Sequence, residues 1–122
     1  MKKLLLLLII LFGCSTQSSK NKVGMQFLLD VKYPQKYENA YQEYRENIAP
    51  ILNGAEMYIA KIDGNGVQGA NYINLVTAKN EEHLNSVLEE VLKSKYHSEY
   101  HLKIGKEKGD VIVISTVRFE FK

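Results

Sequence analysis

Short runs of apolar residues predict four strands along the chain. From Met25 to Tyr33 the apolar residues follow a largely two-residue period, which is the spacing of a strand with one buried face. Residues 56–62, 72–78 and 111–121 are also short, rich in apolar and β-branched residues, and bounded by polar or glycine-containing segments. The turn pattern Asp63-Gly64-Asn65-Gly66 predicts that the second and third of these strands pair as a hairpin.

Helical spacing predicts a long helix after the first strand. It begins after Tyr33 with Pro34, a residue that suits the first turn of a helix. Its apolar stripe consists of Tyr37, Ala40, Tyr41, Tyr44, Ile48, Ile51 and Leu52. Because the stripe continues in phase past Pro50, we expect a kink near residues 46–50 and a helix end at Gly54.

A second helix is predicted after the third strand. Asn80 suits the N-cap, and acidic residues in the first turn complement the helix dipole. The expected core stripe consists of Leu84, Val87, Leu88, Val91 and Leu92. Residues 94–104 are expected to form a short helical or irregular segment, and residues 105–109 are expected to form a polar loop.

The predicted order β-α-β-β-α-β is that of the ferredoxin-like α+β fold, a four-stranded antiparallel sheet with two helices on one face. We assign residues 24–122 to this single domain. The first and last strands are apolar on both sides, so the uncovered face of the sheet is also expected to be apolar. Since such a face usually needs a partner, we expect a homodimer that packs sheet against sheet.

The N-terminal segment has the pattern of a secretory signal. Lys2 and Lys3 precede an unbroken apolar run, which is too short to cross a bilayer as a helix. The motif Leu11-Phe12-Gly13-Cys14 resembles the lipobox of bacterial lipoproteins, in which the cysteine thiol receives diacylglycerol. An ordinary cleaved signal with a chance cysteine is the alternative.

The lipobox resemblance implies a protein of the cell envelope, held at a membrane by acyl chains on Cys14 after residues 1–13 are removed. Ser15 at the second mature position is similar to lipoproteins that are sorted to the outer membrane, if the cell is Gram-negative. Residues 14–23 are mostly small and polar, which is typical of a flexible tether.

Composition excludes several function classes. The formal charge of +2 arises from Lys2 and Lys3, so residues 14–122 are formally neutral and offer no basic field for nucleic acid. Cys14 is the only cysteine, and its lipidation leaves no thiol for a disulfide, a thiolate metal site or a nucleophile. No phosphate-binding glycine loop and no catalytic serine motif is present, and we expect no cofactor.

Several features in order resemble the dimeric α+β barrel superfamily, which includes the antibiotic-biosynthesis monooxygenases. They are the tyrosine-rich first helix with its late Pro50, Gly54-Ala55, Val67-Gln68-Gly69, Ser98-Glu99-Tyr100 and Val111-Ile112-Val113-Ile114. Within the superfamily, the pattern is most similar to the domain-of-unknown-function 1330 family, over about residues 25–116. The resemblance implies either an unassigned function or oxidation of an electron-rich aromatic substrate between sheet and helices. Haem-degrading members rely on a Trp, which this chain lacks.

Two histidines four residues apart, His97 and His101, would project together from a helix and could share a metal ion. A metal site needs a third ligand, and Glu99 lies on the wrong side of such a helix. His83 or Glu90 could approach the two histidines only if the chain folded back toward them. The favoured interpretation is therefore two polar residues on a solvated helix, with no metal.

Three tyrosines and one aspartate are further candidates for ligand binding. Tyr37, Tyr41 and Tyr44 could line a cavity between helix and sheet, or could simply be core aromatics. Asp30 could face a cavity with a raised pKa, or could be solvated on an edge strand. Arg118 could bind a carboxylate, or could pair with Glu120.

The sequence thus favours a membrane-anchored, dimeric, non-catalytic domain that binds a small apolar or aromatic ligand. A monooxygenase-like enzyme is the main alternative, and a purely structural envelope lipoprotein is another.

Overall fold

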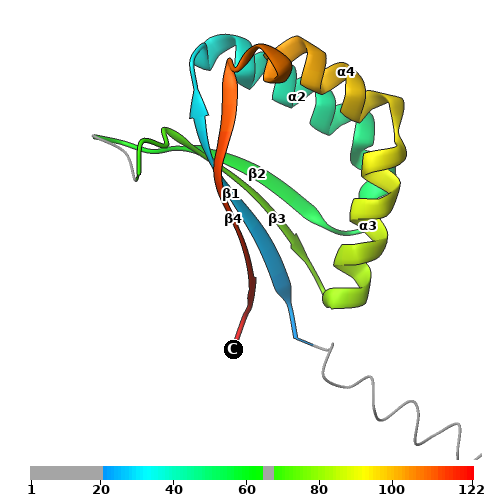
Figure 1. Ribbon diagram of the computed structural model, residues 1–122. Helices are drawn as coiled ribbons and strands as arrows, with labels where there is room; N and C mark the ends of the chain where they lie inside the picture. The colour runs from blue at the N-terminus through cyan, green and yellow to red at the C-terminus, as the bar shows by residue number, and fades with distance from the viewer. Residues whose placement is uncertain (1–20, 65–67) are drawn as a thin grey trace, which may run out of the picture.

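A four-stranded sheet and a layer of helices make up the domain. The computed structural model describes residues 21–64 and 68–122. Its strands are β1 (Val23–Val31), β2 (Glu56–Lys61), β3 (Tyr72–Ala78) and β4 (Val111–Glu120). Its helices are α2 (Pro34–Leu52), α3 (Glu81–Lys93), α4 (Lys95–Ile104) and the short 3-10 helix η2 (Lys106–Lys108). All three α-helices lie on one side of the sheet (Figure 1).

The sheet confirms the predicted ferredoxin-like fold. Its strand order is β2-β3-β1-β4, and every neighbouring pair is antiparallel. The two predicted helices are present as α2 and α3. The ambiguous segment 94–104 forms a third helix, α4, so the helical layer has one element more than the simple β-α-β-β-α-β pattern.

An irregularity in β4 changes which of its side chains face the helices. The pairing with β1 shifts between Leu28 and Leu29, which leaves Ile114 without a partner in the register. Such a bulge reverses the alternation of side chains along the strand. As a result, Val113 on one side of the bulge and Arg118 on the other both point toward the helical layer.

The ends of α2 differ slightly from the prediction. The helix passes through Pro50 and ends at Leu52, as its apolar stripe indicated. The left-handed conformation that ends it already begins at Asn53, with φ 47°, and continues at Gly54. Helix α3 begins as predicted, because the Asn80 side chain accepts a hydrogen bond of 2.8 Å from the backbone N–H of His83.

The core lies between the sheet and the helices and is rich in tyrosine. Its largest fully buried side chains are Tyr37, Tyr72, Ile48 and Leu84. Most of the predicted α3 stripe is buried, but Leu92 is 60% exposed, so its assignment to the core was wrong.

The other face of the sheet is apolar and uncovered, as expected. Tyr58, Ile112, Val117 and Phe121 are between 44% and 51% exposed there, and Leu75 is partly buried. The Phe119 ring crosses Gly24 so closely that a Cβ atom at position 24 would lie 2.4 Å from the ring. Gly24 therefore allows this aromatic side chain to lie flat on the open face.

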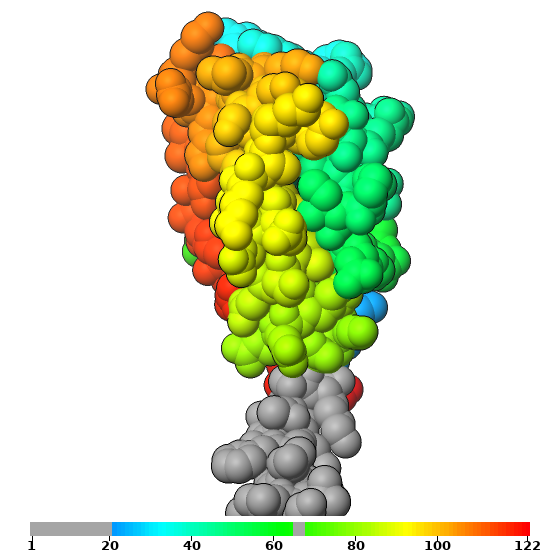
Figure 2. Space-filling model, turned by 90° about the vertical axis from the view of Figure 1, so that its right-hand side faces the viewer, coloured from blue at the N-terminus to red at the C-terminus, as the bar shows by residue number. Residues whose placement is uncertain are grey.

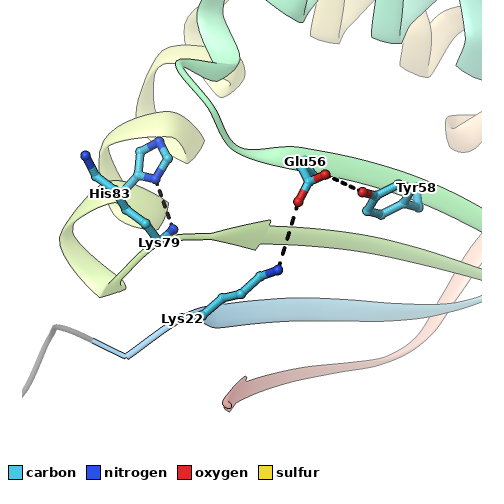
Figure 3. Close-up of polar contacts among 5 residues, drawn as sticks. All are labelled: Lys22, Glu56, Tyr58, Lys79 and His83. Atoms are coloured by element: carbon cyan, nitrogen blue, oxygen red, sulfur yellow. Dashed lines mark hydrogen bonds and ion pairs between the residues drawn. The ribbon is translucent and has the colours of Figure 1, made fainter. Parts of the chain in front are cut away.

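The predicted signal peptide, Cys14 and residues 14–20 of the tether lie outside the described residues. Strand β1 already begins at Val23, so the ordered domain starts within the predicted tether. Just before it, the carbonyl of Lys22 accepts a hydrogen bond from Phe121, and the Lys22 ammonium lies 4.0 Å from Glu56 (Figure 3). Asn65 and Gly66 of the predicted hairpin turn also lie outside the described residues.

Within residues 21–64 and 68–122, no helix combines the length and the apolar character that a membrane crossing requires.

Candidate functional site

A cavity of about 440 Å³ lies between the sheet and helices α3 and α4. Met25, Phe27 and Leu29 of β1 form its floor, and Val87, Leu88 and Val91 of α3 form much of its roof. In Figure 2, β4 runs along the flank of α3 and α4 that is opposite to α2. The cavity opens where Leu92 and Val113, 60% and 40% exposed, line it. Its size and apolar walls suit a small organic molecule.

Helix α4 places both candidate histidines on this cavity. The Ser94 hydroxyl accepts a hydrogen bond from the backbone N–H of His97 and so caps the start of the helix. His97 and His101 are one turn apart, and their ring centroids lie 4.1 Å from each other. The sequence correctly placed the two rings together, and the structure adds that both line the cavity.

Tyr44 links α2 to His97 through a hydrogen bond of 3.0 Å between its hydroxyl and Nδ1. Burial raises the pKa of Tyr44, and burial followed by the nearby Lys106 ammonium lowers the pKa of His97. The tyrosine therefore stays protonated and donates, while His97 is neutral and accepts at Nδ1. This assigns the ring proton of His97 to Nε2.

His101 is the more strongly affected of the two histidines. Burial, His97 and Lys106, in decreasing order, lower the pKa of His101 to about 4. At neutral pH the cavity wall therefore carries two neutral imidazoles, each of which can accept a proton or exchange hydrogen bonds with a ligand.

The three candidate tyrosines have different surroundings. Tyr44 lines the cavity and stacks on Tyr100, with ring centroids 4.2 Å apart and planes inclined by 7°. Tyr37 and Tyr41 lie in the core outside the cavity lining, and burial raises the pKa of Tyr37 to about 12. Their buried hydroxyls have no hydrogen-bond partner among the described residues. Of the three, only Tyr44 has the position expected of a ligand contact.

Asp30 is not brought together with the other candidates. Strand β1 is central rather than an edge strand, and Asp30 pairs with Ile112 on the face that the helices leave open. Its side chain is nevertheless exposed. Any ligand contact by Asp30 would be on the opposite side of the sheet from the cavity.

His83, which the sequence considered as a distant third metal ligand, has a structural role instead. Its Nδ1 accepts a hydrogen bond from the backbone N–H of Lys79 (Figure 3), so its Nε2 carries the proton and donates to the Asn53 carbonyl at 2.8 Å. The ring thereby joins the start of α3 to the end of α2. In the part of the chain that the structure describes, no three His, Cys, Asp or Glu side chains cluster in a way that could hold a metal ion.

Sequence reasoning missed several residues of the cavity. Asn74 of β3 and Lys106 of η2 line it, and so does Arg118, which the sequence left as an ambiguous candidate. Arg118 donates a hydrogen bond of 3.1 Å to Asn85 on α3 rather than pairing with Glu120. No pattern in the sequence indicated these polar residues as neighbours, because they come from β3, β4 and η2 and meet only in the folded structure.

Comparisons with known proteins give the fold. No family model matches the chain, and no curated protein is similar to it in sequence. A solved putative antibiotic biosynthesis monooxygenase from Caulobacter crescentus is similar in structure, with a TM-score of 0.58 and 10% identity, covering 88% of this chain and 95% of that one.

Two other solved structures have the same architecture. A dimeric ferredoxin-like protein of unknown function from Jannaschia has a TM-score of 0.53 and 12% identity, covering 82% of this chain and 99% of that one. SnoaB, a cofactor-independent oxygenase from Streptomyces nogalater solved as a point mutant, has a TM-score of 0.52 and 7% identity, covering 85% and 93%. At these identities the likeness extends to the fold alone, and the chain has a ferredoxin-like α+β fold.

Proposed function

We propose that this protein is a membrane-tethered binding protein for a small apolar or aromatic molecule, which it holds between its sheet and helices α3 and α4. The observation that carries the proposal is the cavity of about 440 Å³, whose walls are mostly aliphatic and aromatic. A few polar groups, among them Asn74 and the two histidines, interrupt these walls. An apolar enclosure with few polar contacts is the usual form of a small-molecule site.

A non-catalytic role agrees with the chemistry of the cavity walls. The lining contains no carboxylate, no thiol and no serine, so a nucleophile paired with a general base is absent from the described lining. Tyr44 and His97 form a hydrogen bond with each other without a charged partner, which suits recognition of a ligand.

Binding can be tested with a neutral fluorescent probe, N-phenyl-1-naphthylamine, and a variant that fills the cavity. Val113→Trp places a bulky ring at the opening, where the valine is 40% exposed, so the fold tolerates it. Leu102→Trp is the matched control, because Leu102 is 73% exposed on α4 and does not line the cavity. We expect the wild type and Leu102→Trp to bind the probe and Val113→Trp to lose binding; equal binding by all three would refute the proposed site.

The proposed membrane tether is supported by the lipobox-like motif that ends at Cys14. Since β1 begins at Val23, residues 15–22 would keep the domain within about 30 Å of the lipid. Metabolic labelling with a palmitate analogue and fractionation of the cell envelope test the tether. We expect label in the wild-type membrane fraction and none in a Cys14→Ser variant; equal labelling of both would contradict lipidation at this residue.

A homodimer is the proposed assembly. The open face of the sheet exposes Tyr58, Ile112, Val117 and Phe121, and apolar patches of this kind in soluble domains usually mark an interface. The similar structure from Jannaschia is described as dimeric.

A monooxygenase-like activity is the second candidate function. It is favoured by one observation: two imidazoles that stay neutral at pH 7 line the cavity, where they could accept a proton from a phenolic substrate. Two of the similar structures are named as an oxygenase or a putative monooxygenase. Oxygen consumption and product formation with quinol-type substrates would test it, with a His97→Ala/His101→Ala double variant as the control.

A further inference from the structure

The charges on the cavity walls are all positive. Lys106 and Arg118 are the lining residues with a formal charge at neutral pH, and no Asp or Glu is among the described residues that line the cavity. Neither cation forms an ion pair with a described residue, and Arg118 instead donates to the neutral amide of Asn85. An apolar cavity with uncompensated cations attracts a ligand that is itself an anion.

The two cations lie at opposite ends of the cavity. Arg118 is opposite Met25 in the sheet, whereas Lys106 follows α4 and precedes the start of β4 at Val111. The apolar residues between these ends belong to β1 and α3, so the cavity is elongated along the strands. A ligand with one charged head and an apolar tail fits this arrangement better than a compact ring.

The Lys106 end is better suited to the charged head. Lys106 lies close enough to His97 and His101 to lower the pKa of both rings, so three nitrogen-bearing side chains gather there. A carboxylate could accept hydrogen bonds from the ammonium and from a ring N–H. At the other end, Glu81 and Glu120 line an adjoining hollow together with Arg118 and oppose an anion.

We propose that the ligand is an amphipathic organic acid, whose carboxylate binds at His101 and Lys106 and whose apolar tail lies between β1 and α3. This inference rests on the proposed binding function and specifies its ligand class. It explains why two cations without an ion-pair partner among the described residues lie on a cavity with mostly apolar walls.

Three ligands with the same ten-carbon tail test the inference: decanoate, decanol and decylammonium. Their affinities are measured by displacement of N-phenyl-1-naphthylamine from the full-length protein and by calorimetry. We expect decanoate to bind about tenfold more tightly than decanol, because a charge-assisted hydrogen bond is worth about 1.4 kcal/mol or more. Decylammonium should bind most weakly.

A pair of variants locates the carboxylate. Lys106→Gln should weaken decanoate binding about five- to tenfold and leave decanol unchanged, because it removes the charge but keeps a polar side chain of similar length. Lys108→Gln makes the same change two residues away in η2, outside the cavity lining, and should have no effect on either ligand. A larger loss with Arg118→Gln than with Lys106→Gln would overturn the proposed orientation.

The outcomes separate this inference from the function on which it rests. If decanol and decylammonium bind as well as decanoate, the site is an apolar cavity without preference for acids, and the inference fails while the binding function remains. If neither the fluorescent probe nor any of the three ligands binds, the proposed function itself fails.

Discussion

His101 is the side chain whose protonation the fold changes most among the histidines. It is partly buried beside His97 and Lys106, and its pKa is lowered to about 4. In the unfolded chain the same imidazole titrates near 6.5. Because the folded state disfavours the proton, acid shifts the equilibrium toward the unfolded state.

This linkage predicts a specific loss of stability in acid. The contribution of His101 is fully present above about pH 6.5 and is lost as the pH falls toward about 4. Solvent screening of the partly buried ring reduces that contribution to on the order of 1 kcal/mol. Urea unfolding from pH 7.5 to pH 4 measures it as the difference between the wild type and His101→Gln. A constant difference across this range would show that His101 does not titrate as described.

Several residues could be assigned from sequence because their role is local. Asn80 caps α3 through a group three residues away, and Pro34 suits the first turn of α2 wherever the helix packs. The hydrogen bond of His83 to Asn53, and the placement of Asp30 away from the cavity, depend on contacts between segments that are distant in sequence. No local pattern encodes such contacts.

Helix α4 and the turn after it are the elements that build the polar end of the cavity. Gly105 ends α4 in the left-handed conformation, with φ 71°, and its N–H donates to the carbonyls of the last turn. A Cβ atom at position 105 would lie 2.3 Å from a carboxylate oxygen of Asp110. Only glycine both adopts this positive φ readily and has no Cβ atom to clash with Asp110. The short helix η2, which contains Lys106, follows directly.

Replacement of this glycine should therefore destabilise the domain and disturb the site. We expect Gly105→Ala to lower the free energy of unfolding by about 1–2 kcal/mol, from the unfavourable φ and the close contact. Gly64→Ala is a suitable comparison, because its φ is also positive but no atom of the described residues lies within 4 Å of its Cβ position. Denaturant unfolding should show a greater loss for Gly105→Ala; equal losses would mean that the Asp110 contact contributes nothing.

Periodicity predicted the elements well but not the details that shape the cavity. The stripe of α3 as far as Val91 and the alternation in β1 follow from local spacing and are present in the structure. The bulge at Ile114 could not be predicted, because it depends on the register between β1 and β4. For this reason the sequence did not show that Val113 and Arg118 share a face.

At the scale of the whole molecule, the described residues form an apolar cavity and an apolar open face of the sheet. The cavity is assigned to a small ligand, whereas the open face of the sheet is assigned to a second copy of the chain. A two-fold interface places the same residues of both copies near one another. A new charge at its centre therefore lies close to the same charge on the other copy.

A single charge on the open face should therefore dissociate the dimer. Leu75 lies on this face in the central part of β3, and Leu75→Glu would place two carboxylates in an apolar interface. Leu102→Glu is the control, because that leucine is exposed on the helical side. By light scattering coupled to size exclusion, we expect dimers of the wild type and Leu102→Glu, and monomers of a folded Leu75→Glu. A wild type that stays monomeric at high micromolar concentration would contradict the assembly.

The proposed function requires that a ligand enters between the sheet and the helices rather than adhering to the open face. Methyl-resolved nuclear magnetic resonance during a titration with decanoate tests this directly. We predict that the methyl signals of Leu88, Val91 and Val113 shift and saturate together, while those of Leu75 and Val117 stay unchanged. Shifts confined to Leu75 and Val117 would place the ligand on the opposite face and contradict the account.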